Sequence, residues 1–203
     1  MNRVIVVFGG AFNPPTNSHF SLSEQICSEY EEIEKVIFVP VSDKYPKEDL
    51  LPAEHRVEML RKVCEKNNKF SVSTIEVDTE ELLGTIETLR RIQKSHPEHE
   101  IWFTMGTDNL KNMALWKGYK KLVTHFTALV LERDDDVMEH IINQNHELKA
   151  YRDSFIKVKE TVRSNCNSTL IRDKVRRGKS IRYLVPDEVY EYIRLKGMYT
   201  IVE

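Results

Sequence analysis

A short apolar run near the start of the sequence ends in a turn rich in glycine and proline, and this pairing is typical of a wound α/β sheet. Residues Val4 to Phe8 are all apolar, mostly β-branched and without alternation, which is typical of a strand buried on both faces of a parallel sheet. The chain then passes through Gly9 and Gly10 into the sequence AFNPPTNSH. In wound α/β sheets, ligands bind outside the carboxyl ends of the strands, so this turn marks the expected ligand edge.

Strand and helix patterns alternate along the rest of the chain. We expect further strands at four apolar runs, 35–41, 70–77, 100–106 and 126–133. Helices are expected from about residue 16 to 30 and over 52–66, 85–96, 136–151, 168–178 and 186–197. This alternation predicts a doubly wound parallel α/β sheet of the Rossmann-like type. Since no linker-like segment divides the chain, we expect one domain over 1–203, with a small C-terminal helical part from about 164 to 203.

Composition argues against several classes of protein. The 203 residues carry 30 basic and 32 acidic side chains, a formal charge of -2, so no basic field points to nucleic acid as a partner. The three cysteines, Cys27, Cys64 and Cys166, lie in no paired spacing, which indicates neither a disulfide framework nor a protein-built metal site. No apolar stretch approaches the length of a membrane span. We expect a cytoplasmic protein without a membrane partner, and a homo-oligomer is compatible with the sequence.

The turn itself has groups that suit phosphate. Its two glycines let backbone amides approach a ligand, and Pro14 and Pro15 place the start of a helix near Thr16. A helix start presents free N–H groups and partial positive charge to an anion. His19 lies one helical turn after Thr16 on the same face and can donate to a phosphate oxygen. For an isolated histidine, an ordinary polar role in a first turn is the more common interpretation.

The sequence of the turn resembles a known family. GGAFNPPTNSH (9–19) is similar to the phosphate-binding turn of nucleotidyltransferases related to class I aminoacyl-tRNA synthetases, whose usual motif is His or Thr, any residue, Gly and His. Here the motif consists of Thr16, Asn17, Ser18 and His19, with serine in place of glycine. FNPPTNSH is also similar to the form FNPxTNxH of eukaryotic nicotinamide mononucleotide adenylyltransferases, in which that glycine is absent as well.

Three further stretches resemble the same enzymes, in the same order. VSDKYPKEDLLPAEHRVEML (41–60) is similar to a family segment with Asp, Tyr, Lys and Pro-Ala-x-His-Arg-Val, and FTMGTDNL followed by LW (103–116) is similar to Gly-x-Asp-x-Leu and a later Trp. STLIRDKVRRGKSIRYLVPDEVYEYI (168–193) resembles the closing segment of nicotinate and nicotinamide mononucleotide adenylyltransferases nearly residue for residue. Cys166 and Asn167 replace the usual Ile-Ser before it. Residues 134–163 add nothing to the resemblance.

The resemblance implies an enzyme of NAD biosynthesis that joins ATP to a pyridine mononucleotide with release of pyrophosphate. Such a reaction is catalysed mainly by positioning and charge neutralisation. The implied catalytic residues are His19, Thr16, Lys47 and Arg172. The implied ATP-binding residues are Gly9, Gly10, Phe12, His19, Lys47, Gly106, Asp108, Ser168, Thr169 and Arg172. The implied pyridine nucleotide-binding residues are Gly10, Ala11, Phe12, Thr85, Thr88 and Trp116. Mg²⁺ is the implied cofactor, bound with the ATP phosphates and mostly to water.

Several of these residues also have ordinary structural interpretations. Ser168 and Thr169 are natural N-cap residues, and Arg172 suits a solvated helix face. Asp108 suits the start of a helix, where a carboxylate complements the helix dipole. Trp116 suits the core.

The sequence leaves the acceptor open between two bases. GTIETL (84–89) is similar to bacterial nicotinate mononucleotide enzymes, and a threonine hydroxyl can donate to a carboxylate-bearing ring. The first turn is similar to eukaryotic nicotinamide mononucleotide enzymes instead. We expect nicotinate mononucleotide as the acceptor, with nicotinamide mononucleotide as the alternative. Phosphopantetheine is disfavoured by the tail SIRYLVPDEVYEYI, and a catalytically impaired nucleotide-binding sensor, with Ser18 and Asn167 as signs of decay, is the alternative from another class.

Overall fold

The computed structural model describes residues 3–132, 135–159, 162 and 164–200 and is built on one parallel sheet. The six strands follow the order β3-β2-β1-β4-β5-β6, and every neighbouring pair is parallel. They are β1 (Arg3–Gly10), β2 (Ile33–Pro40), β3 (Phe70–Val72), β4 (His99–Gly106), β5 (Thr127–Leu131) and β6 (Phe155–Lys157). The first three connections run through the helices α1 (Asn17–Glu29), α2 (Ala53–Cys64) and α3 (Thr85–Ser95). The prediction of a doubly wound α/β fold is confirmed.

Each face of the sheet has its own helices. The even-numbered apolar residues of β1 share one buried cluster with Ile26 of α1 and Leu60 of α2. The odd-numbered ones share another with Leu89 of α3 and Leu122 of α5 (Tyr119–His125). Because successive strand residues point to opposite faces, a strand covered on both sides must be apolar throughout, as this one is.

The predicted third strand was too long, because a turn ends it early. β3 stops at Val72, and the backbone amides of Val77 and Asp78 both donate to the carbonyl of Thr74. The predicted fifth strand ends at Leu131, and residue 133 lies outside the described residues.

The predicted helix 136–151 is two short helices, α6 (Met138–Gln144) and α7 (His146–Lys149). The Asn145 side chain accepts from the amides of Glu147 and Leu148 and so caps a new helix at that point. Five short elements were not predicted at all. These are α4 (Thr107–Asn112), η1 (Met113–Leu115), α5, η2 (Arg152–Ser154) and the three-residue strand β6.

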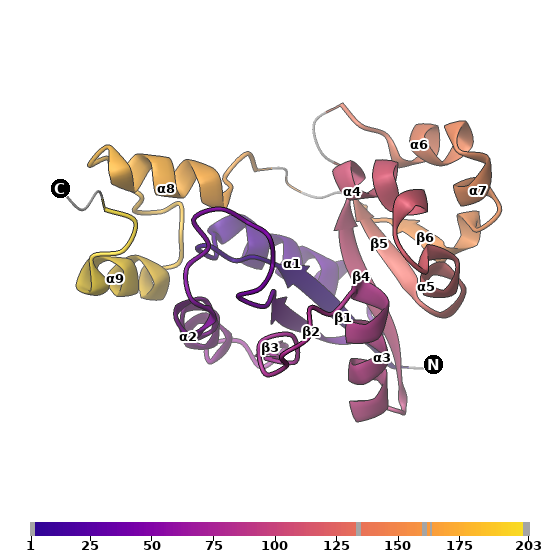
Figure 1. Cartoon of the computed structure of the whole chain (residues 1–203), viewed down its shortest axis with the longest axis horizontal. Helices are drawn as coiled ribbons and strands as arrows, with labels where there is room; N and C mark the ends of the chain where they lie inside the picture. The colour runs from indigo at the N-terminus through magenta and orange to yellow at the C-terminus, as the bar shows by residue number, and fades with distance from the viewer. Residues whose placement is uncertain (1–2, 133–134, 160–161, 163, 201–203) are drawn as a thin grey trace.

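Two helices follow the sheet, α8 (Ser168–Arg176) and α9 (Asp187–Lys196), as predicted. Figure 1 shows them at the end of the molecule away from α6, α7 and β6. Ile171 of α8 and Val189 of α9 share a small buried cluster with Met59 of α2. The cap differs from the expectation for Ser168 and Thr169, because the side chain of Asn167 caps α8 by accepting from the Leu170 amide at 2.9 Å. Among the described helices, none combines the length and the hydropathy of a membrane span.

Candidate active site

The predicted ligand edge coincides with the point where the strand order reverses. The chain moves outward from β1 to β2 and β3, and then returns to place β4 on the other side of β1. Gly10 ends β1 and Gly106 ends β4, so both glycines lie at the carboxyl edge of this central pair. A crevice at such a reversal is the usual ligand position in open α/β sheets.

The turn after β1 folds back over the end of its own strand. Phe12 takes a positive φ of 47°, and its ring is buried with only 1% of its surface exposed. A Cβ atom on Gly10 would lie 3.2 Å from the Phe12 ring, so a side chain there would crowd the ring, which glycine avoids. Nothing lies within 4 Å of a Cβ on Gly9. The ring of Phe12 belongs to the core, which leaves its backbone as the part that can reach a ligand.

His19 is held by the residue that caps its helix. The backbone amide of Thr16 donates to Nδ1 of His19 at 3.0 Å, and the Thr16 hydroxyl oxygen lies 2.8 Å from the same nitrogen. Because a backbone amide only donates, Nδ1 is the acceptor and the ring proton lies on Nε2. The rings of Phe12 and Phe8 pack against the imidazole at centroid distances of 5.1 and 5.9 Å. Thr16 therefore fixes both the orientation and the tautomer of His19.

The start of α8 is tied directly to this turn, although about 150 residues separate the two in sequence. The Ser168 hydroxyl donates to the Pro14 carbonyl at 2.8 Å, and Nη1 of Arg172 donates to the Asn13 carbonyl at 2.9 Å. Nη2 of Arg172 lies 3.5 Å from the Thr169 hydroxyl. The structure thus brings together three of the predicted ATP-binding side chains with the first turn.

Arg172 also has one donor that the surrounding protein does not satisfy. The residue is 7% exposed, and its Nε is the one buried side-chain nitrogen or oxygen without a hydrogen-bond partner among the described residues. A buried unsatisfied donor costs free energy, and charged donors cost the most. Such an atom is what an anionic ligand would satisfy.

Lys47 lies on the loop that follows β2, close to the positive charge of Arg172. Its side chain is at the surface, yet loss of surrounding water lowers the pKa of its ammonium group, and the positive charge of Arg172 lowers it further. The second effect means that the two cations are close enough to repel each other. An anion between them would relieve that repulsion.

The residues expected near the pyridine lie on α3 and on the segment after β4. Thr85 begins α3 and is half-buried, and Trp116 is half-buried after η1, with its side chain against the larger core cluster. A Cβ on Gly118 would lie 4.0 Å from Ile86, which places these two segments next to each other. Asp108 is exposed in the first turn of α4, after Gly106.

Thr88 lies in the same helix, but its hydroxyl is already used. It is buried and donates to a carboxylate oxygen of Glu76 at 2.7 Å. Burial raises the pKa of the Glu76 carboxyl, and the Thr88 hydroxyl partly offsets this. Thr88 therefore holds α3 against the turn after β3, and its predicted contact with the pyridine nucleotide stays a prediction.

Arg56 is a residue of the site region to which the sequence assigned no role. It is fully buried in α2, and its guanidinium donates to main-chain carbonyls at 2.7 to 3.1 Å and to a carboxylate of Asp43 at 2.8 Å. The carbonyls belong to Leu51, Ala11 and Val41. One side chain thus joins the turn after β1 to both ends of the loop that carries Lys47. Arg56 lies within the family-like segment Pro-Ala-x-His-Arg-Val, so the sequence signal was present, although it gave this arginine no role.

Taken together, the arrangement can hold a polyphosphate. It offers the start of α8, an oriented imidazole donor and the cations Lys47 and Arg172 on one edge of the sheet. The start of α1 offers less than the sequence predicted, because the amides of Asn17 and His19 already donate to the carbonyls of Leu184 and Thr16. Within the described residues, no group of three or more His, Cys, Asp or Glu side chains is placed to hold a metal ion.

Comparisons with known proteins place this arrangement in context. Residues 7–174 match the cytidylyltransferase-like family. The chain is similar to a probable nicotinate-nucleotide adenylyltransferase of Halalkalibacterium halodurans, with 31% identity over 96% of this chain and 90% of the relative. Another protein of that name, from Rubrobacter xylanophilus, is 33% identical over 95% of this chain and 90% of its own length.

Solved structures show the same fold. The structure of Plasmodium falciparum nicotinic acid mononucleotide adenylyltransferase complexed with NaAD superposes with a TM-score of 0.79 at 20% identity and covers 97% of both chains. The complex of that protein with APC gives a TM-score of 0.76 at 19% identity over the same shares. At these identities the likeness is one of fold.

Proposed function

The chain belongs to the cytidylyltransferase-like family and, within it, to the nicotinate-nucleotide adenylyltransferases, and on this basis we propose that it transfers the adenylyl group of ATP to nicotinate mononucleotide. The products would be nicotinate adenine dinucleotide and pyrophosphate, a step of NAD biosynthesis. The observation that carries the proposal is the joining of the His19 turn to Arg172, whose buried Nε lacks a partner among the described residues. A polyphosphate bound at this junction would satisfy that donor.

The reaction needs positioning more than it needs a nucleophilic side chain. An oxygen of the mononucleotide phosphate attacks the α-phosphorus of ATP, and a new P–O bond forms there. The bond from the α-phosphorus to the α,β-bridging oxygen breaks, and its electron pair leaves with pyrophosphate. With Nδ1 bound by Thr16, His19 would contact the α-phosphate through the proton on Nε2. That contact would strengthen as charge develops in the transition state.

The remaining cations would hold the leaving group. Arg172, Ser168 and Thr169 at the start of α8 would bind the β- and γ-phosphates, and Lys47 would approach them from the loop after β2. Negative charge between Lys47 and Arg172 would remove the repulsion that lowers the pKa of Lys47. Backbone amides from Gly9 to Phe12 would receive the phosphate of the acceptor.

Mg²⁺ fits this site as an ion carried by the nucleotide. The proposed phosphate-binding side chains are hydrogen-bond donors without a carboxylate among them, and no cluster of ligating side chains occurs in the described part of the chain, which suits an ion held by phosphate oxygens and water. When bound, Mg²⁺ would neutralise charge on the phosphates.

The acceptor base would lie against α3 and the segment after β4. Thr85 would donate to the carboxylate of nicotinate, and Trp116 would stack on the pyridine ring. Gly106 and Asp108, at the end of β4, would contact the ribose of ATP. Thr88 would support this pocket through its bond to Glu76. Nicotinamide mononucleotide is the alternative acceptor, because an amide group is also able to accept from a threonine hydroxyl.

The test is pyrophosphate release with ATP and Mg²⁺, using nicotinate mononucleotide, nicotinamide mononucleotide and phosphopantetheine separately at equal concentrations. We expect release only with the pyridine mononucleotides, faster with nicotinate, and a product of dinucleotide mass. Faster release with nicotinamide mononucleotide would show that this nucleotide, the alternative acceptor, is the preferred substrate. Release with phosphopantetheine alone would overturn the acceptor. No release with any of them, from a protein that still binds ATP, would identify a nucleotide-binding sensor.

A further inference from the structure

A single buried asparagine connects four parts of the chain around the proposed site. Asn13 is 0% exposed and follows Phe12 in the turn after β1. Its side-chain amide donates to the Asp49 carbonyl at 2.7 Å, and its side-chain oxygen lies 3.4 Å from the Leu51 amide. Its own carbonyl accepts from Arg172 at 2.9 Å. The loop carrying Lys47 and the start of α8 are therefore both fixed relative to Asn13.

The fourth partner of Asn13 comes from beyond the last helix. The hydroxyl of Tyr199 donates to the Asn13 side-chain oxygen at 2.8 Å, across 186 positions of sequence. Burial raises the pKa of the Tyr199 phenol well above its usual range, even though the nearby charges of Arg172 and Arg56 act to lower it. The phenol is therefore protonated over the ordinary pH range and acts as a donor. That donation fixes which end of the Asn13 amide faces Asp49.

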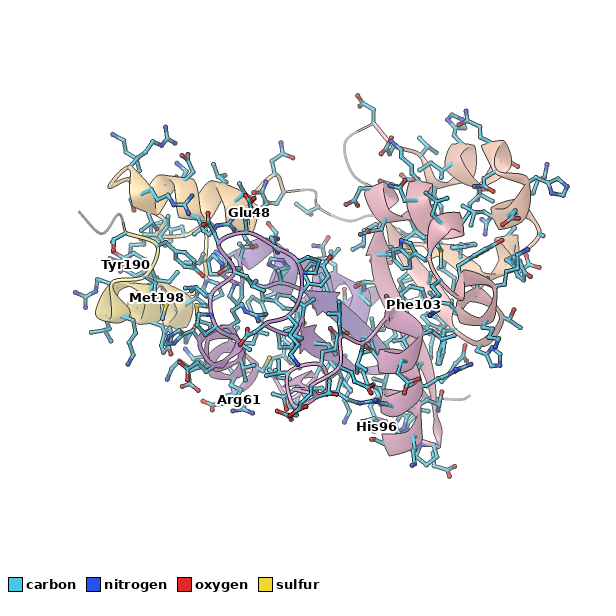
Figure 2. The ribbon with its side chains drawn as sticks, viewed as in Figure 1. Glu48, Arg61, His96, Phe103, Tyr190 and Met198 are labelled. Atoms are coloured by element: carbon cyan, nitrogen blue, oxygen red, sulfur yellow. The ribbon has the colours of Figure 1, made fainter. Side chains whose placement is uncertain are left out.

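The residue before Tyr199 anchors the segment. Met198 is buried in the cluster formed by α2, α8 and α9, and in Figure 2 it lies beside α9. Tyr199 itself has a positive φ of 63°, which turns its side chain back from the end of α9. The loop that carries Lys47 has a second link to the C-terminal helices, since Arg176 of α8 donates to the Asp49 carboxylate at 2.6 Å. Figure 2 shows Glu48 of this loop next to α8.

We propose that Tyr199 is a positioning residue for adenylyl transfer. Through Asn13 it sets the place of the turn after β1 and of the loop that carries Lys47, both relative to Arg172. It acts through Asn13 and touches neither substrate. This inference rests on the proposed function for its kinetic consequence, whereas its structural consequence, order in the loop 43–51, can be measured without substrates.

The variant Tyr199→Phe removes only the hydroxyl, and Tyr192→Phe is its matched control. Tyr192 lies in α9, and its hydroxyl is paired with His55 at 3.0 Å instead of with the site. In unliganded protein we expect faster amide hydrogen exchange in 43–51 for Tyr199→Phe than for wild type or the control. Unchanged exchange in this loop would overturn the proposal, whether or not the protein releases pyrophosphate.

The kinetic test separates positioning from a general loss of stability. We expect kcat/KM for ATP to fall about 3- to 10-fold in Tyr199→Phe, the effect of one lost hydrogen bond, while the control stays near wild type. In a Lys47→Ala background the same change should have a smaller effect, because the loop no longer carries its cation. A drop in melting temperature with unchanged kcat/KM, or an effect of equal size in both backgrounds, would contradict the proposal. If the wild type itself releases no pyrophosphate, the proposed function fails and the exchange measurement alone decides the inference.

Discussion

At the scale of single residues, the site depends on side chains that are fixed by main-chain groups. His19 is oriented by the Thr16 amide, Arg172 is held by the Asn13 carbonyl, and Arg56 donates to three carbonyls. Because the partners are main-chain groups, the position of each side chain depends on the backbone conformation and not on the rotamer of another side chain. The consequence is a site whose geometry is set when the loops fold.

Arg56 offers a direct test of this arrangement. Its partner Asp43 is more than half exposed, so that ion pair is weak, whereas the three carbonyls would lose their donors inside the protein. We expect Arg56→Lys to lower the free energy of unfolding by about 3–5 kcal/mol, because an ammonium group cannot reach all these acceptors. Asp43→Asn, which keeps an acceptor, should change it by about 1 kcal/mol or less. Urea unfolding measures both, and equal losses would show that the ion pair contributes as much as the carbonyl contacts, contrary to this expectation.

At the scale of elements, long apolar patterns were predicted well and short ones were not. The strands β1, β2, β4 and β5 and the helices α1, α2, α3, α8 and α9 occur where periodicity indicated them. β6 has only three residues and α4 only six, too few to show a period. β3 ends early because a turn at Thr74, stabilised by backbone bonds, overrides an apolar pattern that continues to residue 77. Elements of this length are determined by the packing around them.

The contact between Glu76 and Thr88 joins the turn after β3 to α3. It predicts that the stability of the fold depends on pH. Burial raises the pKa of Glu76, so the folded state binds its proton more tightly than the unfolded state does. The contribution of Glu76 to stability is therefore largest below the pKa of an ordinary glutamate. It is lost as the pH rises through the raised pKa that Glu76 has in the folded state. Glu76→Gln keeps the acceptor for Thr88 and removes the charge, so we expect it to raise the free energy of unfolding at pH 7.

That gain should shrink as the pH is lowered toward 4, where the wild-type carboxyl gains its proton. Denaturant titrations at several pH values measure it. The exposed Glu98 provides the control, because Glu98→Gln should have little effect at either end of the range. A Glu76→Gln variant that is less stable than wild type at pH 7 would show that the ionised carboxylate is the favoured form.

At the scale of the whole molecule, the C-terminal helices complete a site that begins at the first strand. Arg172 and Tyr199 reach Asn13 across 159 and 186 positions of sequence. The sequence predicted the ligand edge and, through the family resemblance, which residue types gather there. It assigned no role to Tyr199, nor to Asn13 and Arg56 within the family-like motifs, because their partners are main-chain or amide groups that come close only in the folded chain. The expectation of one domain over 1–203 stays a prediction, and these long-range contacts favour it.

If adenylyl transfer takes place at the turn after β1, the kcat of the enzyme should depend on His19, which the variant His19→Ala measures. His125→Ala is the control, since His125 is exposed on α5 and its Nδ1 is paired with the Lys121 carbonyl. We predict that His19→Ala lowers kcat about 10²- to 10³-fold, as expected for one lost transition-state donor, while it still folds and binds ATP within a few-fold of wild type. The control should keep wild-type kcat. If His19→Ala turns over at the wild-type rate, the reaction takes place without this residue and the account of the site is wrong.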